Sequence, residues 1–241
     1  GSVYGGAVTA TGATGKATGN SVTITGDATV GGDVYGGFAA GTGATTGNIV
    51  NLGDKTGTFT GSVTGTVGGG SNANNVTGNT LNINTNANVG NIENFEKLVF
   101  DLNSTVNTAN AMLNLTGGAA TGGLDWRKLE VNTDSLTGAG IKTYEPYRVK
   151  LMENTSGISF QKGTDNTYTL GGGAKSAVTE KLEYVIDTNN SLGTGATSVS
   201  LEGYQFKGNT AAAYAAADGT HAEAWSGRTK IGNKVEGNTL T

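Results

Sequence analysis

One six-residue phrase occurs three times early in the chain, as Gly19-Asn20-Ser21-Val22-Thr23-Ile24, Gly47-Asn48-Ile49-Val50-Asn51-Leu52 and Gly78-Asn79-Thr80-Leu81-Asn82-Ile83. The copies follow one another at nearly equal intervals along the chain. In each copy the fourth and sixth residues are apolar and a Thr or Asn stands between them, which is the period of a strand with one buried face. The Gly-Asn pair before each strand predicts a tight corner, because glycine tolerates a positive φ.

A second phrase alternates with the first. Ser2-Val3-Tyr4-Gly5-Gly6 returns as Asp33-Val34-Tyr35-Gly36-Gly37 and, more loosely, as Thr66-Val67-Gly68-Gly69. A strand with two buried side chains hides too little apolar surface to be stable alone. Stacking the repeats places each apolar residue above its counterpart and builds a continuous core. The repeats therefore predict an all-β chain folded as a parallel β-solenoid.

The composition agrees with such a fold. Gly, Thr and Asn supply 42, 38 and 25 of the 241 residues, while charged residues are 14% and proline occurs once. Disordered chains of low hydrophobicity usually rely on charge and proline, so wholesale disorder is disfavoured. The glycines follow no three-residue period, which excludes collagen. The bias is also unlike a typical enzyme interior and indicates a turn-dense β protein.

Charge and hydropathy exclude several partners. The net charge is −4 and no basic patch is present, so neither nucleic acid nor an anionic membrane is expected as a partner. No apolar run is long enough to span a bilayer, and the absence of cysteine excludes disulfides and thiolate metal sites. The chain starts inside one repeat unit and ends inside another, at Gly237-Asn238-Thr239-Leu240-Thr241, so we expect a piece cut from a longer array.

The distribution of charge divides the chain into three parts. Residues 1–92 hold only 5 of the 34 charged residues and form the regular repeats, 93–231 are expected to form larger, more charged coils with a side insertion, and 232–241 begin a further repeat. The Ala-rich segment Thr210–Asp218 breaks the strand rhythm and predicts a short helix. Within 93–231 the strand rhythm continues in alternating apolar sets: Leu98/Phe100/Leu102, Leu113/Leu115, Leu129/Val131, Val149/Leu151, Ile158/Phe160, Tyr168/Leu170, Leu182/Tyr184/Ile186, Val199/Leu201 and Tyr204/Phe206.

These units carry a family likeness. The alternating Val-Tyr-Gly-Gly and Gly-Asn-x-Val-x-Ile units, followed by Gly90-Asn91-Ile92-Glu93-Asn94-Phe95, resemble the passenger regions of autotransporter (type V secreted) surface proteins of Gram-negative bacteria. Later phrases such as Met112-Leu113-Asn114-Leu115-Thr116-Gly117 resemble the same group. The resemblance implies a right-handed parallel β-helix displayed outside the cell, with adhesion or self-association as its role. It implies no catalytic residue, and the family's C-terminal translocator barrel has no counterpart in this sequence.

Residues that could support catalysis are few and scattered. His221 is the single histidine and stands in a loop-like context, which favours a surface side chain. Two acid pairs, Glu180 with Glu183 and Asp125 with Glu130, have the residue types of a glycosidase, but solvated charge is the better interpretation of both. Gly31-Gly32-Asp33-Val34 lacks the Gly-Gly-x-Gly-x-Asp pattern of calcium-binding β-rolls, so a stacked calcium array is not expected. We therefore predict no enzyme activity, no catalytic residue, no metal site and no cofactor.

Aromatic residues are the remaining candidates. Tyr4 and Tyr35 hold equivalent places in consecutive repeats, so their rings should stack. Packing in the core or at a corner is the favoured interpretation, and an exposed aromatic strip for glycans is the alternative. Trp126 and Trp225 are isolated, and we expect a loop or the Ala-rich segment to cover them.

The expected function is that of a secreted, non-catalytic β-solenoid segment at a bacterial surface. Its expected partners are like chains, bound laterally or end to end, or a surface receptor or glycan, with outer-membrane attachment through another region. The alternatives are a carbohydrate-active or carbohydrate-binding β-helix and a purely structural spacer.

Overall fold

The computed structural model is essentially all-β, with almost no helix in the residues that it describes. No helix in those parts of the chain is long and apolar enough to cross a membrane. The described residues are 1–54, 59–73, 75–103, 105–118, 120–124, 128–135, 146–160, 174–178, 183–187, 196–204, 212–215, 222–226 and 229–233.

Two sheets of parallel strands build the N-terminal part of the molecule. Sheet 1 contains, in spatial order, β1 (Val3–Val8), β4 (Val34–Ala39), β6 (Ser62–Gly70), β8 (Ala87–Glu93), β10 (Leu113–Leu115) and β13 (Pro146–Phe160). Sheet 2 contains β2 (Ser21–Ile24), β5 (Ile49–Leu52), β7 (Thr80–Ile83), β9 (Lys97–Asp101) and β12 (Leu129–Asn132). Two short strands join sheet 1 at its side, β3 (Thr29–Val30) on β6 and β11 (Ala120–Leu124) on β13.

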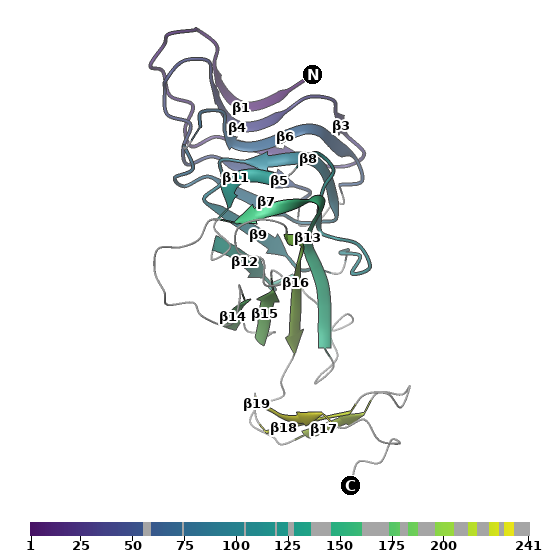
Figure 1. The fold of residues 1–241 in the computed structure, drawn as a ribbon. Coiled ribbons are helices and arrows are strands. Elements are labelled where there is room, and N and C mark those ends of the chain that lie inside the picture. The colour runs from purple at the N-terminus through teal and green to yellow at the C-terminus, as the bar shows by residue number, and fades with distance from the viewer. Residues whose placement is uncertain are drawn as a thin grey trace.

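The chain passes back and forth between these sheets, and successive strands of each sheet stack one beneath the other from the N-terminal end (Figure 1). Neither sheet closes on itself within the described residues.

The strand register matches the sequence repeats. Val22 pairs with Val50 and Val50 with Leu81 in sheet 2. In sheet 1, Tyr4 pairs with Tyr35, and the looser third phrase also aligns, because Tyr35 pairs with Gly68. The spacing of the repeats in the sequence is therefore the spacing of the strands.

The apolar core lies between the two sheets. The fourth and sixth residues of each repeat are buried as predicted, and so are the later sets that begin at Leu98, Leu113, Leu129 and Val149. Sheet 1 supplies the facing side chains, among them Val34, Val67, Val89 and Ile92. Each strand of sheet 2 contributes only two apolar residues to this core, so the core is stable only as a stack.

Each repeat begins with a corner that carries an asparagine, which is half-buried in the first copy and fully buried in the other two. Gly19, Gly47 and Gly78 take φ values of 68°, 67° and 69°, as the corner requires. The following residues, Asn20, Asn48 and Asn79, form what we call the inner amide column. Asn48 Nδ2 donates to Ala17 O at 3.1 Å, and Asn48 Oδ1 accepts from Asn20 N at 2.9 Å. Asn48 and Asn79 are fully buried, so these amides hold the corner together instead of facing water.

The glycine pairs of sheet 1 have a matching role. A Cβ on Gly36 would stand 2.6 Å from Asn48 Cβ and 2.9 Å from Gly69 O, and a Cβ on Gly69 would stand 2.5 Å from Asn79 Cβ. Only glycine lets sheet 1 approach the inner amide column this closely. The two sequence phrases therefore recur at matching intervals, because the glycines of one phrase pack against the asparagine of the other.

After β13 the direction of pairing changes. β16 (Ala196–Tyr204), β15 (Glu183–Asp187) and β14 (Ala174–Val178) extend sheet 1, but β13 pairs with β16, β16 with β15 and β15 with β14 antiparallel. The expectation of larger parallel coils is therefore wrong for these strands. The physical reason is that alternation every two residues is the same for parallel and antiparallel strands.

The Ala-rich segment is also different from its prediction. Ala212–Ala215 forms β17, which pairs antiparallel with β18 (Ala222–Ser226), and β18 pairs with β19 (Thr229–Asn233). A helix this short gains too few hydrogen bonds to offset its nucleation cost, so pairing with a neighbouring strand prevails. The predicted helix is therefore absent from these four residues.

The strand pairing is continuous through the predicted boundary at residue 92. β9 pairs with β7, β10 with β8 and β13 with β10, so both sheets cross this point. The change at residue 92 is one of composition, whereas the change in pairing direction comes after β13. Of the third predicted part, 232–241, only residues 232 and 233 are described.

Candidate binding surfaces

An aromatic cluster stands on the outer face of sheet 1. We call Tyr4, Tyr35 and Phe38 the aromatic platform. The Tyr4 and Tyr35 rings are stacked, with centroids 6.3 Å apart and planes 22° apart, and the Phe38 centroid lies 4.6 Å from that of Tyr4. Tyr4 is 40% exposed, and the other two rings are partly exposed. Stacked aromatic faces open to solvent are suited to bind flat apolar surfaces, including the faces of sugar rings.

Neighbouring strands hold the Tyr35 ring in place. Gly68 is its register partner on β6, and a Cβ there would stand 2.5 Å from Tyr35 Cδ1, so the ring lies directly over the glycine. One strand further, Glu93 Oε1 accepts a hydrogen bond from the Tyr35 hydroxyl at 2.7 Å. Burial, followed by this hydrogen bond and the Glu93 charge, raises the pKa of Tyr35 above its ordinary value.

The prediction that Tyr4 and Tyr35 stack is confirmed, but neither ring belongs to the core. The favoured interpretation, packing in the core or at a corner, is therefore wrong, since the rings stack on the outside. Of the two tryptophans, Trp126 lies outside the described residues and Trp225 lies in β18, where the backbone alone is described.

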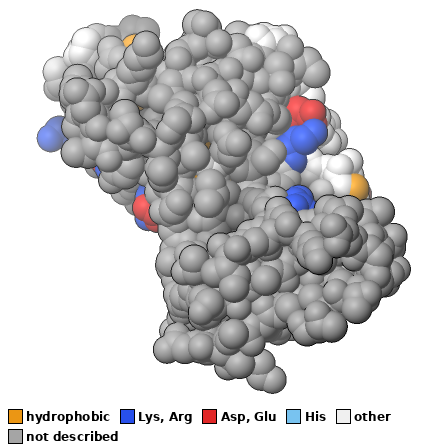
Figure 2. Space-filling model, turned by 60° about the horizontal axis from the view of Figure 1, so that its bottom comes forward, with side chains coloured by type: hydrophobic (Ala, Val, Ile, Leu, Met, Phe, Trp, Pro, Cys, Tyr) orange, Lys and Arg blue, Asp and Glu red, His pale blue; other side chains and the backbone are white. Residues whose placement is uncertain are grey.

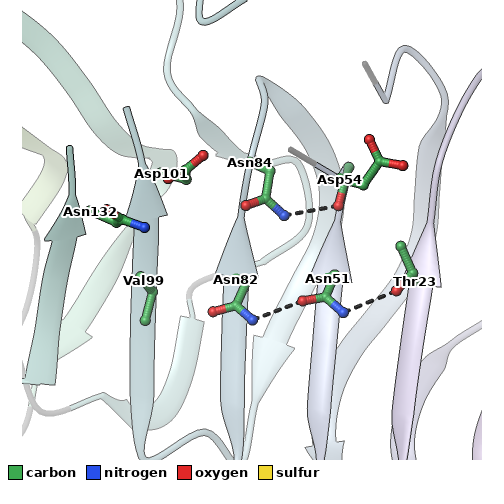
Figure 3. Close-up of a pocket in the computed structure, with 9 residues that line it drawn as sticks. Thr23, Asn51, Asp54, Asn82, Asn84, Val99, Asp101 and Asn132 are labelled. Carbon is green, nitrogen blue, oxygen red and sulfur yellow. Dashed lines mark hydrogen bonds between the residues drawn. The ribbon is translucent and has the colours of Figure 1, made fainter. Parts of the chain in front are cut away.

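The outer face of sheet 2 carries a row of hydrogen-bonded side chains. We call Thr23, Asn51 and Asn82 the outer amide row. Asn82 Nδ2 donates to Asn51 Oδ1 at 2.8 Å, and Asn51 Nδ2 donates to Thr23 Oγ1 at 3.0 Å (Figure 3). The row arises because each side chain is the fifth residue of its six-residue phrase and the strands are in register.

A groove of about 340 Å³ runs beside this row, and we call it the amide groove. Two carboxylates and four amides line it, whereas none of the lining residues is basic. Asn84 donates from Nδ2 to Gly53 O at 2.9 Å, across neighbouring strands. The lining residues are Thr23, Asn51, Gly53, Asp54, Asn82, Asn84, Val99, Asp101 and Asn132 (Figure 3).

A second polar hollow, of about 280 Å³, lies on sheet 1. Asn114 Nδ2 donates to Asn88 Oδ1 at 2.8 Å, and Glu153, its other wall, pairs with Lys150 at 2.8 Å. Hydrogen-bonded asparagine side chains therefore occur on the outer faces of both sheets.

The acidic residues considered for catalysis are not brought together as a described site. Glu130 is exposed and its carboxylate lies 2.7 Å from the Lys97 ammonium, as expected of solvated charge. Asp125, Glu180 and His221 lie outside the described residues, and Glu183 lies in β15, where its backbone alone is described. Among the described residues no three His, Cys, Asp or Glu side chains gather as a metal site would require.

The charged side chains of the described residues are dispersed where Figure 2 shows them. The charged side chains of the described residues form separate small groups there instead of one continuous patch. Two of the groups on the molecule are the exposed pairs Lys97–Glu130 and Lys128–Glu96, which contribute little stability at the surface.

Comparison of the chain with protein-family models, with curated proteins and with solved structures finds no match.

Sequence reasoning missed several residues that shape these surfaces. Phe38 of the platform, and Gly68 and Glu93 beside it, are brought to Tyr4 and Tyr35 by the register of the strands. The one signal in the sequence was that Gly68 and Tyr35 hold the same place in their repeats. Asp101 is the last residue of β9 and lines the amide groove together with Asn84 and Asn132. No motif in the sequence marks it.

Proposed function

We propose that this chain is a segment of an extracellular, right-handed parallel β-solenoid on a bacterial surface, which mediates adhesion or self-association without catalysis. Its parallel strands, paired in register over both sheets, support the solenoid, as does the sequence likeness to autotransporter passengers. The aromatic platform is the observation that carries a binding role. A spacer without a ligand gives no reason for partly exposed, stacked rings on its outer face.

Adhesion is tested by displaying residues 1–241 on beads and measuring their retention on surfaces that carry glycans or bacterial cells. Replacing Tyr4 and Phe38 together by serine should lower retention about tenfold, because exposed aromatic rings dominate such contacts. The matched control is Ile49→Ser, which removes an exposed apolar side chain from the other sheet. Equal retention of all three proteins would remove the platform from the proposal.

Self-association, lateral or end to end, is tested by sedimentation velocity over a wide concentration range. An increase in particle size with concentration is the expected result. A strictly monomeric particle at every concentration would leave adhesion to another partner as the function.

Carbohydrate binding is the second candidate, and the platform also favours it. Stacked rings bind the apolar face of a sugar, while nearby Glu93 and Asp33 are acceptors for its hydroxyl groups. Soluble oligosaccharides should then compete with bead retention. If an unrelated solenoid of equal length replaces the segment without loss of adhesion, the segment is a spacer and both binding proposals fail.

A further inference from the structure

Asp101 has a buried oxygen with no partner. The residue ends β9 and is 2% exposed. Its Oδ2 atom accepts a hydrogen bond from Asn103 Nδ2 at 3.3 Å, but its Oδ1 atom is buried and has no hydrogen-bond partner. Buried carboxylate oxygens are almost always satisfied, because leaving one unpaired forfeits its hydration. The geometry therefore indicates that something from outside the chain completes this atom.

The surroundings of Asp101 are oxygen-rich. Asn84 donates through Nδ2 to Gly53 O, which leaves Asn84 Oδ1 turned toward the β9 side of the groove in Figure 3. On the other side, Asn132 is the register partner of Asp101. The amide groove that contains them is lined by two carboxylates and by no lysine, arginine, histidine or cysteine. A positively charged ligand that prefers oxygen fits this lining better than an anion or an apolar group.

Calcium is the cation that suits these donors. It takes six to eight oxygen ligands from carboxylates, amide carbonyls and water in flexible geometry, whereas Zn²⁺ prefers nitrogen and sulfur. The groove volume of about 340 Å³ leaves room for water ligands. We propose that the amide groove binds one calcium ion between β7 and β9, with Asp101 Oδ1 and Asn84 Oδ1 as side-chain ligands and water completing the shell.

Such an ion would join two strands whose connection is shortened. Thr80 of β7 is the register partner of Lys97 of β9. The earlier register partners of sheet 2, Ser21 with Ile49 and Ile49 with Thr80, are separated by clearly longer stretches of chain. With few charged ligands the affinity is that of weak extracellular calcium modules, a Kd of about 0.1–1 mM. Calcium then stabilises the stack at the place where its repeat changes, independently of any adhesive role.

The test titrates CaCl2 into the EDTA-treated chain, with binding followed by calorimetry and stability by thermal unfolding in circular dichroism. Calcium at about ten times its Kd should raise the unfolding midpoint by about 3 °C, and MgCl2 at equal concentration should raise it less. Asp101→Asn should weaken calcium binding at least about tenfold. Asp33→Asn is the matched control on sheet 1, because asparagine retains the Oδ1 acceptor for Thr66 N, and its calcium binding should be unchanged.

A second variant keeps the proposal falsifiable if Asp101→Asn does not fold. Asn132→Asp places a second carboxylate beside Asp101 and retains an oxygen for the hydrogen bond from Asp134 N. Without calcium, the two neighbouring carboxylates should repel each other, so the thermal unfolding midpoint in EDTA should be lower than that of the native chain. Calcium binding should be about tenfold tighter. The proposal is overturned if calcium acts no differently from magnesium on the native chain, if Asp101→Asn binds calcium as well as the native chain, or if Asn132→Asp binds it no more tightly.

Discussion

Two sets of asparagines belong to the same repeated phrases of sheet 2 but have opposite surroundings. Asn48 and Asn79, in the inner amide column, are fully buried, whereas Asn51 and Asn82, further along each phrase, lie in the partly exposed outer amide row. The inner amides bond to one another and also to main-chain oxygens of other segments, whereas the outer ones bond mainly along their own row. One residue type therefore fastens the corner segments together and also presents polar groups on the outer face.

The largest expected effect comes from truncating an asparagine of the inner amide column, and the comparison is with an asparagine of the outer amide row. Asn48→Ala leaves Ala17 O and Asn20 N without their buried partner, and each unpaired group costs about 1–3 kcal/mol. We expect a loss of about 3 kcal/mol in the free energy of unfolding, measured by urea denaturation. Asn51→Ala breaks bonds at a partly solvated surface and should cost about 0.5–1 kcal/mol. Equal losses would contradict the division between column and row.

The glycine pairs of sheet 1 test how closely that sheet packs against the inner amide column. Gly36→Ala forces a methyl group to within 2.6 Å of Asn48 Cβ, and overpacking of this kind costs about 1–3 kcal/mol. Gly31→Ala is the matched control, since a Cβ there meets nothing within 4 Å. Urea denaturation should show a loss for Gly36→Ala and almost none for the control. A tolerated Gly36→Ala would mean that sheet 1 does not approach the inner amide column so closely.

The smallest expected effect concerns the outer face of sheet 1. Because folding raises the pKa of Tyr35, its contribution to stability is complete below its ordinary pKa of 10.0 and is lost as the pH rises through the folded value. The thermal midpoint should therefore fall more steeply above about pH 10 in the native chain than in Tyr35→Phe. Burial also raises the pKa of Tyr147, so the variant should keep part of the slope. Identical pH profiles would contradict the burial of the Tyr35 hydroxyl and its hydrogen bond to Glu93.

The repeats allowed the register of both parallel sheets to be predicted, because apolar pairs such as Val22 and Ile24 recur at the spacing of the strands. The buried corner was not predictable in the same way. Asparagine is common in turns and on strand surfaces, so nothing in the sequence separates Asn48 from Asn51 until the Gly36 backbone is seen against the Asn48 side chain.

The remaining features depend on distant pairing. The antiparallel direction of β14 to β16 and the strand at Ala212–Ala215 follow from partners that local pattern and propensity do not identify. The contact of the platform with Glu93 and the place of Asp101 in the groove were missed for the same reason. Tyr35 meets Glu93 from a distant part of the chain, and Asp101 meets its groove neighbours only when the strands are stacked.

The in-register stacking of the repeats is tested most directly by cysteine pairs in this cysteine-free chain. Ser21 and Ile49 are exposed register partners on adjacent strands, about 4.8 Å apart and within disulfide range. Ser21→Cys with Ile49→Cys should cross-link under mild oxidation, whereas Ser21→Cys with Asn51→Cys, displaced along the strand to about 8 Å, should not. Equal or preferential cross-linking of the displaced pair would contradict the stacked register.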